Sequence, residues 1–485
     1  MFAGQPFFMP RAFITLLLAL CSLAAQAQMK VWEEPPPHRY GPFPEKPLPA
    51  PVADNTPAAG DLVPVHTIAE AGITDPLKLS KVDARINSAI AAGAFPGCRV
   101  LCAKDGKIFY DRAFGYFTYD KQQPVTAATV YDLASLSKVT ATTLAIMRLY
   151  EQGRLDLDKT IGDYLPAARG TDKAPILVRN LLLHQAGLKA WIPFYKSLLD
   201  SNKRLLDTAF HTRPDKRYSL PVAKDIYLRN DYRDTIWQMI YTSPLEVPGK
   251  YVYSDLDYYF LAAIAEKISG KPMDQYVADQ FYTPMGLKTI GYNPRQRLNP
   301  ALIPPTEDDQ TFRRQVVQGF VHDPGAALFG GVGGHAGVFS NAGDVAAIFQ
   351  MLLNEGTYHG KRFYKPETVR KFIAYGSPVS RRGLGFDKPE GKSDDAGPTA
   401  TRCSGFTFGH QGFTGTCAWA DPQNGVVFVF LSNRVYPNAE NSLITKLGVR
   451  TAAQDELYEA LGIAEDYNRP AVKKFQVETG TYKPQ

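Results

Sequence analysis

The most informative stretch of this sequence reads Tyr131-Asp132-Leu133-Ala134-Ser135-Leu136-Ser137-Lys138, and a strongly apolar pattern continues from it. We expect a long helix from about Ser135 to Gln152, with Gly153 as its terminator. Ser135 and Lys138 are three residues apart, which places both side chains on one face of a helix. The lysine ammonium and the positive helix end favour a Ser135 alkoxide, and partial desolvation can lower the lysine pKa so that Lys138 takes the proton. This is the only S-x-x-K in the chain, and it predicts a nucleophilic serine with a lysine base.

Strand patterns lie near both ends of the chain, and helical patterns dominate between them. Apolar runs at Cys98 to Ala103 and Lys107 to Phe114 flank Asp105-Gly106, which is a strong signal for a hairpin turn. The other expected elements are helices at Leu79 to Ala92, Tyr258 to Ser269 and Ala342 to Asn354, strands at Phe406 to His410, Thr416 to Ala420 and Val426 to Leu431, and a final helix at about Ala439 to Leu461. We therefore predict an α/β (α+β) fold, in which an antiparallel sheet assembled from both ends is flanked by helices and carries an inserted, mostly helical lobe.

The first residues predict an export signal rather than part of the fold. Arg11 precedes an apolar run from Phe13 to Leu20 that is too short for a comfortable membrane span, and Ala25-Gln26-Ala27 resembles a cleavage site. Prolines crowd the segment from Glu33 to Val65, which is therefore expected to be an extended spacer. The predicted organisation is a signal peptide at 1–27, the spacer at 28–65, one two-lobed catalytic body at 66–465 (sheet lobe at about 78–155 and 395–465, helical lobe at about 156–394), and a tail at 466–485.

The composition indicates a folded protein without a nucleic-acid footprint. Hydrophobic residues make up 45% of the 485 residues and charged residues 21%, and the net charge is +6. Three basic doublets, Arg313-Arg314, Arg381-Arg382 and Lys473-Lys474, are short and scattered, and we expect each to be solvated surface. No nucleic-acid partner and no stable membrane span are expected, and the oligomeric state stays open.

Four cysteines follow the predicted signal peptide: Cys98, Cys102, Cys403 and Cys417. If Cys98 and Cys102 share a strand, they lie about 13 Å apart, beyond the reach of a disulfide. We favour four apolar thiols in packed strands over a disulfide framework.

Several familiar signatures do not apply. No serine lies in a G-x-S-x-G. Gly391-Lys392-Ser393 lacks the earlier glycine of a phosphate-binding loop, and the glycine-rich run from Gly331 to Ala336 follows no clear strand, so we interpret it as a tight turn. The eight histidines are dispersed, and no metal-ligand spacing is present. We expect neither a cofactor nor a metal.

Several stretches, in order, resemble the penicillin-recognising serine hydrolases, the family of class C β-lactamases, DD-peptidases and related esterases and amidases. They are Asp132-Leu133-Ala134-Ser135-Leu136-Ser137-Lys138, Gly153-Arg154-Leu155-Asp156-Leu157-Asp158, Leu181-Leu182-Leu183-His184-Gln185-Ala186-Gly187-Leu188 (with Ala186 where the family has a serine), Pro248-Gly249-Lys250-Tyr251-Val252-Tyr253-Ser254-Asp255 and Phe408-Gly409-His410-Gln411-Gly412. The resemblance spans about Ala69 to Leu461. Within the family, the sequence resembles a cell-wall-associated subgroup that consists of the penicillin-binding-protein-4B-like DD-carboxypeptidases and the amidases that detach peptides from muramic acid.

The resemblance implies a role for each matching residue. Ser135 would be the acylated nucleophile, Lys138 its base partner and Tyr253 a second acid/base group. The ordinary pKa of a tyrosine is about 10, so cationic neighbours must lower the pKa of Tyr253 for this role. His410 and Gly412 would line the site from an edge strand. The backbone N–H groups of Ser135 and Phe413 would form the oxyanion hole.

Two positions depart from the pattern of the β-lactamases, which carry Y-x-N and K-T-G. Asp255 replaces an amide that donates as well as accepts, and an ionised carboxylate at this position could pair with Lys138 and change its protonation. His410 replaces a fixed cation that would attract a substrate carboxylate, so efficient β-lactam hydrolysis is not expected.

The glycine-rich segment that contains His322 and His335 also resembles the cell-wall subgroup. Structural hydrogen bonding is the expected role of both histidines, and a place on the pocket rim is the alternative.

The leading hypothesis is an exported (periplasmic or extracellular) serine hydrolase that acts through a Ser135 acyl-enzyme on amide or peptide bonds of peptidoglycan or its fragments. An esterase or weak β-lactamase is the second interpretation. The third is a catalytically silent penicillin-binding or peptidoglycan-binding protein in which Asp255 has inactivated the catalytic site. The bond cleaved stays open among these.

Overall fold

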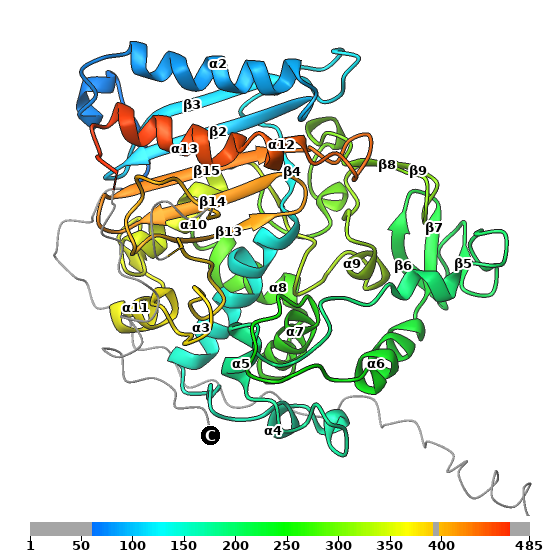
Figure 1. Ribbon diagram of the computed structural model, residues 1–485. Coiled ribbons are helices and arrows are strands. Elements are labelled where there is room, and N and C mark those ends of the chain that lie inside the picture. The colour runs from blue at the N-terminus through cyan, green and yellow to red at the C-terminus, as the bar shows by residue number, and fades with distance from the viewer. Residues whose placement is uncertain (1–60, 391–396, 466–485) are drawn as a thin grey trace, which may run out of the picture. The chain divides into compact units, whose positions relative to one another are not determined.

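The computed structural model describes residues 61–390 and 397–465 (Figure 1). The predicted signal peptide, most of the predicted spacer, the predicted tail and the Lys473-Lys474 doublet lie outside these residues. Within them, no helix is long and apolar enough to cross a membrane.

A six-stranded sheet joins the two ends of the described chain. Its order is β1 (Val63–Pro64), β3 (Lys107–Gly115), β2 (Gly97–Lys104), β15 (Val426–Ser432), β14 (Thr416–Asp421) and β13 (Phe408–Gly412). The β2–β3 hairpin turns at Asp105-Gly106 as predicted, and β15 pairs with β2 from Cys98 to Lys104, with Phe430 opposite Val100. All neighbours are antiparallel except β1 and β3, so a short parallel edge makes the predicted antiparallel sheet mixed.

Helices cover both faces of this sheet because its inner strands are apolar on both sides. On β15, Phe428 and Phe430 pack into the core beneath α2 (Leu77–Ala91) and α13 (Val449–Ala460). The alternate residues of β15 join the core on the other face, where α10 (Ala342–Leu353) contacts β15, β14 and β2. Although α10 falls within the sequence range of the predicted helical lobe, it packs against the sheet.

The remaining helices form the inserted part of the chain, with α7 (Leu256–Ser269) near its centre (Figure 1). The other α-helices are α4 (Ile161–Tyr164), α5 (Val178–Leu182), α6 (Tyr232–Thr242), α8 (Met273–Val277), α9 (Pro324–Leu328) and α11 (Pro366–Ile373). A π-helical turn spans Ala278–Tyr282, and 3-10 turns in this part span Pro166–Ala168, Phe194–Leu198, Pro294–Gln296 and Pro300–Leu302. A further 3-10 turn, Ile68–Ala71, precedes α2.

The inserted part also contains strands that sequence patterns did not indicate. β5 (Phe210–His211), β7 (Ile226–Arg229) and β6 (Tyr218–Ala223) form a three-stranded sheet. Shorter ladders pair β8 (Glu307–Asp309) with β9 (Gln315–Val317), β11 (Thr357–Tyr358) with β12 (Lys361–Arg362), and β10 (Phe339–Ser340) with β4 (Tyr131–Asp132). The β4–β10 ladder is the functionally relevant one because it ends directly before the Ser135 turn.

Two predicted long helices are interrupted. The segment expected to be helical from Ser135 to Gln152 consists of a 3-10 turn (Ala134–Leu136), a π-helical turn (Lys138–Thr142) and α3 (Thr143–Glu151). The final helix is split into α12 (Leu443–Lys446) and α13, because Gly448 between them has a left-handed φ of 56°.

The prediction for the cysteines is confirmed, with one exception in placement. All four thiols are free and buried. Cys98 and Cys102 lie in β2 and Cys417 in β14, whereas Cys403 lies outside the strands.

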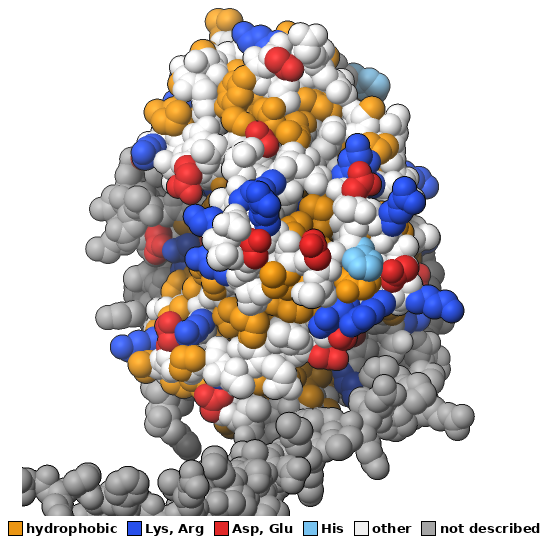
Figure 2. Space-filling model, turned by 90° about the vertical axis from the view of Figure 1, so that its right-hand side faces the viewer, with side chains coloured by type: hydrophobic (Ala, Val, Ile, Leu, Met, Phe, Trp, Pro, Cys, Tyr) orange, Lys and Arg blue, Asp and Glu red, His pale blue; other side chains and the backbone are white. Residues whose placement is uncertain are grey.

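The prediction that the basic doublets are solvated surface is wrong for two arginines. Arg313 is 3% exposed and binds Asp309, and Arg382 is 4% exposed beside the candidate active site. On the face drawn in Figure 2, lysine and arginine side chains are interspersed with acidic and hydrophobic ones rather than gathered into one basic patch.

Candidate active site

The turn that carries Ser135 is held from several sides. Ala134 has a left-handed φ of 46°, which is unfavourable for a residue with a Cβ atom. Asp132 stabilises this conformation because its Oδ1 accepts the Ala134 N–H at 2.8 Å and its Oδ2 accepts the His322 N–H at 2.6 Å. The Leu133 N–H donates to the Val338 carbonyl at 2.9 Å. Ser135 is therefore presented at the start of the interrupted helix, half-buried and in a defined orientation.

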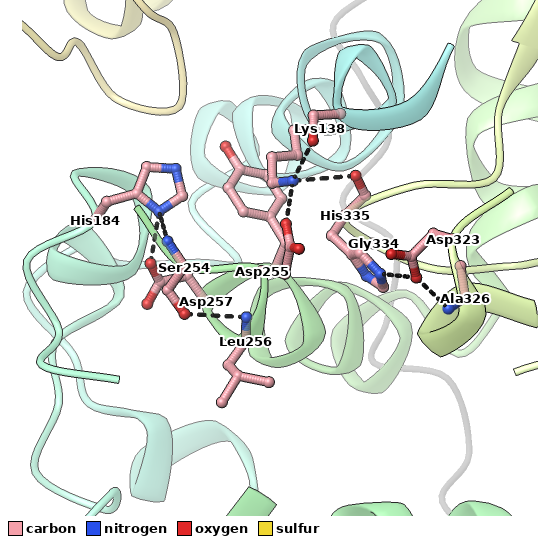
Figure 3. Close-up of polar contacts among 12 residues, drawn as sticks. Lys138, His184, Ser254, Asp255, Leu256, Asp257, Asp323, Ala326, Gly334 and His335 are labelled. Carbon is pink, nitrogen blue, oxygen red and sulfur yellow. Dashed lines mark hydrogen bonds and ion pairs between the residues drawn. The ribbon is translucent and has the colours of Figure 1, made fainter. Parts of the chain in front are cut away.

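Lys138 is the buried cation of the site. Its Nζ is 3.0 Å from Ser135 Oγ, 2.6 Å from Asp255 Oδ1 and 3.2 Å from the His335 carbonyl oxygen. Figure 3 shows the side chain of Lys138 reaching from its helix toward Asp255 and toward the backbone at His335, which follows α9 in the chain. The structure thus brings together the two residues of the S-x-x-K, and it pairs Lys138 with the carboxylate at the third position of Tyr253-Ser254-Asp255.

This pairing reverses the direction of the pKa shift expected for Lys138. Burial lowers the pKa of Lys138, but the negative charge of Asp255 and the Tyr253 phenol raise it more, and the pKa of Lys138 lies above its ordinary value. In the resting site Lys138 is therefore an ammonium ion. Desolvation alone would have produced the neutral lysine predicted from the sequence.

Tyr253 lies against the same ammonium group. Lys138 Nζ is 5.0 Å from the centre of the tyrosine ring, and the phenol interacts with both Lys138 and Ser135. Burial raises the pKa of Tyr253, and the lowering effect of Lys138 does not offset it because Asp255 acts in the opposite direction. Tyr253 is therefore a neutral phenol, placed to donate a proton rather than to accept one.

A buried histidine and carboxylate beneath Tyr253 escaped the sequence analysis. His184 packs against the Tyr253 ring with centroids 4.6 Å apart, and its Nδ1 is 2.6 Å from Asp257 Oδ2 (Figure 3). Burial raises the pKa of Asp257 far above its usual range and lowers that of His184, which makes both groups neutral. His184 belongs to the family-like stretch that includes Ala186, and that stretch was the available signal for it.

Hydrogen bonds fix the Tyr253 segment to the loop that follows α5 and contains His184. The Val252 N–H donates to the His184 carbonyl at 2.9 Å, and the Asp255 N–H donates to the Ala190 carbonyl at 2.8 Å. Ser254 Oγ donates to the Lys189 carbonyl at 2.6 Å. These bonds position Tyr253 and Asp255 at the start of α7.

The edge strand β13 brings His410, Gly412 and Phe413 next to the nucleophile turn. A Cβ atom on Gly412 would lie 2.4 Å from the Leu133 carbonyl oxygen, so only glycine allows this approach. Phe413 follows at the end of the strand and is 53% exposed, and its carbonyl accepts a hydrogen bond from Arg434 Nε at 2.7 Å.

His410 is buried and uncharged. Its Nδ1 is 2.6 Å from the Gln411 carbonyl, its Nε2 has no hydrogen-bond partner among the described residues, and its ring centre is 5.9 Å from that of Tyr253. Burial, with Arg382 and Lys138 as neighbouring positive charges, lowers the pKa of His410 to about 3. The site thus has a neutral imidazole where β-lactamases carry a fixed cation.

Arg382 is a third residue whose role in the site sequence reasoning missed. Its guanidinium lies 5.3 Å from the centre of the Tyr253 ring and donates to the Tyr251 hydroxyl from Nε and Nη2 at 3.2 and 3.0 Å. Asp387, 3.5 Å away, balances its charge. Because Arg382 is only 4% exposed, it contributes charge behind the tyrosine rather than an open binding surface.

The described residues contain no group of three or more histidine, cysteine or acidic side chains that could hold a metal ion. The chemistry that this arrangement supports is that of a serine nucleophile beside a lysine and a tyrosine, with a cavity adjoining Asp255.

Comparison with known proteins agrees with this geometry. The family model for β-lactamase matches residues 82–453. The "Putative D-alanyl-D-alanine carboxypeptidase" of Escherichia coli K12 is 33% identical over 74% of this chain and 82% of its own length, and the N-acetylmuramyl-L-alanine amidase of Bacillus subtilis 168 is 33% identical over 78% of this chain and 86% of its own.

Two solved structures share the fold. EstCE1, a hydrolase with promiscuous acyltransferase activity, superposes with a TM-score of 0.57 at 24% identity and covers 78% of this chain and 99% of its own. A penicillin-binding-protein homologue from Caulobacter crescentus superposes with a TM-score of 0.56 at 21% identity and covers 79% and 98%. The chain belongs to the β-lactamase family and is a serine hydrolase of that family.

Proposed function

We propose that this serine hydrolase is exported and cleaves amide or peptide bonds of peptidoglycan or its fragments through an acyl-enzyme on Ser135. The observation that carries the proposal is the 3.0 Å contact between Ser135 Oγ and the fully buried Lys138 Nζ, beside Tyr253. The relatives named as a D-alanyl-D-alanine carboxypeptidase and as an N-acetylmuramyl-L-alanine amidase support the choice of an amide in a cell-wall substrate.

In the proposed reaction Ser135 attacks the carbonyl carbon, and its proton passes to Lys138. Lys138 accepts that proton only after the resting ammonium has lost one proton to solvent, and Asp255 at 2.6 Å opposes this loss because it stabilises the ammonium. Tyr253, a neutral phenol in contact with Ser135, then protonates the leaving nitrogen, and Lys138 passes the serine proton on to the Tyr253 oxygen, which restores the phenol and the neutral lysine. Water hydrolyses the acyl-enzyme along the same route in reverse.

The N–H groups of Ser135 and Phe413 are the proposed donors to the developing oxyanion. Thr414 Oγ1 donates to the Asp132 carbonyl at 2.7 Å and Thr416 Oγ1 donates to the Leu133 carbonyl at 3.0 Å, which supports a fixed distance between the two turns. A preorganised pair of donors of this kind contributes a large share of the rate in acyl transfer.

The test combines an active-site probe with product analysis. A fluorophosphonate or fluorescent penicillin should label the wild-type protein and not Ser135→Ala, and the absence of any Ser135-dependent label would refute the acyl-enzyme. Mass analysis of digested muropeptides then identifies the bond, because loss of one D-Ala and loss of the whole stem peptide give different masses.

Ester hydrolysis is a second candidate activity, favoured by one observation. His410 is neutral, so the site does not require a carboxylate on its substrate. Turnover of a nitrophenyl ester that exceeds that of every muropeptide would favour this alternative. Probe binding without turnover of any substrate, with ligand affinity retained in Ser135→Ala, would instead favour a silent binding protein.

A further inference from the structure

The proposed reaction gives no role to the buried pair formed by His184 and Asp257. Their side chains are 0% and 1% exposed, and Asp257 Oδ2 lies 2.6 Å from His184 Nδ1. The two residues come from different elements, because His184 follows α5 and Asp257 lies in the first turn of α7. Tyr253, which precedes α7, packs its ring on His184 with centroids 4.6 Å apart. The pair therefore connects two elements directly beneath a residue of the proposed reaction.

The hydrogen bonds at His184 Nδ1 indicate where the proton of this pair lies. The backbone N–H of Ser254 donates to Nδ1 at 3.2 Å, and Asp257 Oδ2 contacts the same nitrogen (Figure 3). A ring nitrogen that accepts a hydrogen bond carries no hydrogen of its own. The hydrogen in the 2.6 Å contact therefore belongs to Asp257, and the imidazole hydrogen is on Nε2. This arrangement corresponds to a carboxylic acid at Asp257 and a neutral imidazole at His184.

The surroundings of Asp257 agree with a protonated carboxyl. Asp257 Oδ1 has no hydrogen-bond partner among the described residues, so an ionised Asp257 would be a buried carboxylate with at most one donor. Burial raises the pKa of Asp257 well above its ordinary value, and the negative charge of Asp255 raises it further. The positive end of α7 favours an anion in its first turn, but this effect is smaller than the cost of burying a carboxylate with so few donors.

The neutrality of the pair also bears on Lys138. An ionised Asp257 would be a second anion near the Lys138 ammonium, in addition to Asp255, and would raise the pKa of Lys138 still further. Activation of the serine needs a neutral lysine, so a protonated Asp257 avoids an additional barrier. Two carboxyl groups two residues apart thus have opposite protonation states, as their environments dictate. The charged and titratable groups that act on the pair are Lys138, Asp255, Arg382 and His410.

We propose that Asp257 is a positioning residue, a buried carboxylic acid whose O–H holds His184 in its Nε2–H tautomer. The bare Nδ1 of His184 then accepts the Ser254 N–H, and the imidazole ring supports the ring of Tyr253. This is the reverse of the histidine–carboxylate pair in a serine-protease triad, where the carboxylate accepts the histidine N–H. The proposal rests on the proposed function, in which Tyr253 is the proton donor.

The kinetic test compares Asp257→Asn with Asp257→Leu, a side chain of similar size that cannot donate. The asparagine N–H can replace the carboxylic O–H as the donor to His184 Nδ1 without a change in charge. Asp257→Leu should lower kcat about 10–100-fold with little change in KM, because Tyr253 is no longer held in place. Asp257→Asn should recover most of this loss.

The pH profile of acylation distinguishes an acid at this position from a carboxylate. Asp257→Asn should leave the midpoint of the profile in place, whereas Asp255→Asn, the positive control, should move it to lower pH. A midpoint that falls in Asp257→Asn would overturn the proposal, because it would show that a negative charge had been removed. An asparagine variant no more active than the leucine variant would overturn it as well.

A spectroscopic test locates the proton without turnover and so separates this proposal from the proposed function. In Ser135→Ala with ¹⁵N-labelled histidine, the NMR signals that His184→Gln removes should show a bare Nδ1 and a protonated Nε2 at every pH at which the protein is folded. The infrared difference spectrum between this protein and its Asp257→Asn variant should contain the C=O band of a protonated carboxyl.

The outcomes of the spectroscopic test are distinct. If both signals are present but the wild-type protein acylates no substrate, the proposed function fails and the assignment of the proton to Asp257 stands. A hydrogen on His184 Nδ1, or the absence of the carboxyl band, refutes the proposal whatever the enzyme cleaves.

Discussion

Replacement of Asp255 by asparagine tests the electrostatic account of the nucleophile most directly. The carboxylate lies 2.6 Å from the Lys138 Nζ, and removal of a neighbouring negative charge lowers the pKa of an ammonium group. Coulomb's law with an effective dielectric constant of about 20 gives about 6 kcal/mol at this distance, as an upper value. Asp255 exposes 27% of its side chain, so solvent screens the pair, and we expect the pKa of Lys138 to fall by about 1–3 units.

The assay is the acylation rate of Ser135 by a small uncharged ester as a function of pH. If Lys138 must be neutral to accept the serine proton, the rate rises with pH toward a plateau with a midpoint at the pKa of Lys138. In Asp255→Asn this midpoint should move to lower pH by the same 1–3 units, with about a tenfold gain in rate per unit below both midpoints. Asp323 lines the same hollow as Asp255 but does not contact Lys138, so Asp323→Asn is the matched control and should leave the midpoint in place. An unchanged or raised midpoint in Asp255→Asn would refute the reasoning.

Three further predictions follow from the contacts around the site. Gly412→Ala should abolish activity and lower the free energy of unfolding by about 1–3 kcal/mol, measured by chemical denaturation, because the new Cβ would lie 2.4 Å from the Leu133 carbonyl oxygen. Tyr253→Phe should reduce kcat/KM by about 10²–10⁴-fold with an unchanged melting temperature, since it removes the phenol that contacts Ser135 but keeps the packed ring. His410 has a pKa of about 3 when folded and should protonate at about 6.5 when unfolded, so the unfolded state binds more protons between these values and stability falls as the pH is lowered below 6.5. His410→Gln should make the unfolding free energy less dependent on pH in that window, and an unchanged slope would show that His410 is not buried in its neutral form.

The sequence indicated those elements of the fold that depend on residues close together in the chain. The Asp105-Gly106 hairpin, the apolar run Val426 to Leu431 in β15 and the glycine at 153 each follow from neighbouring residues, and the structure has them where the patterns placed them. The breaks within the helix after Ser135 were not visible, because the segment down to Gln152 contains no glycine or proline to mark the π-helical turn at Lys138–Thr142.

Only the site residues that lie in short sequence motifs could be predicted. Ser135 and Lys138 are linked by spacing, and the pairing of Lys138 with Asp255 followed from the family-like order of motifs. Arg382 could not be found this way, because a basic doublet in a loop is solvated unless a distant group, here Tyr251, receives it. The sequence left the sign of the Lys138 pKa shift open, because burial lowers that pKa and the Asp255 carboxylate raises it, and only a distance decides between them.

The distribution of charge around Ser135 bears on which substrates fit. On one flank the positive charge of Arg382 is enclosed behind Tyr253 and balanced by Asp387, and His410 is neutral, so this flank offers a substrate carboxylate little exposed positive charge. On the other flank the cavity presents carboxylate oxygens and an exposed indole. β-Lactams and D-Ala termini both carry a carboxylate close to the bond that is cleaved, whereas the amide between a muramyl lactyl group and a peptide has uncharged groups on its acyl side. The electrostatics therefore favour an amide of the second kind, and slow turnover of nitrocefin relative to a muramyl peptide is the expected consequence.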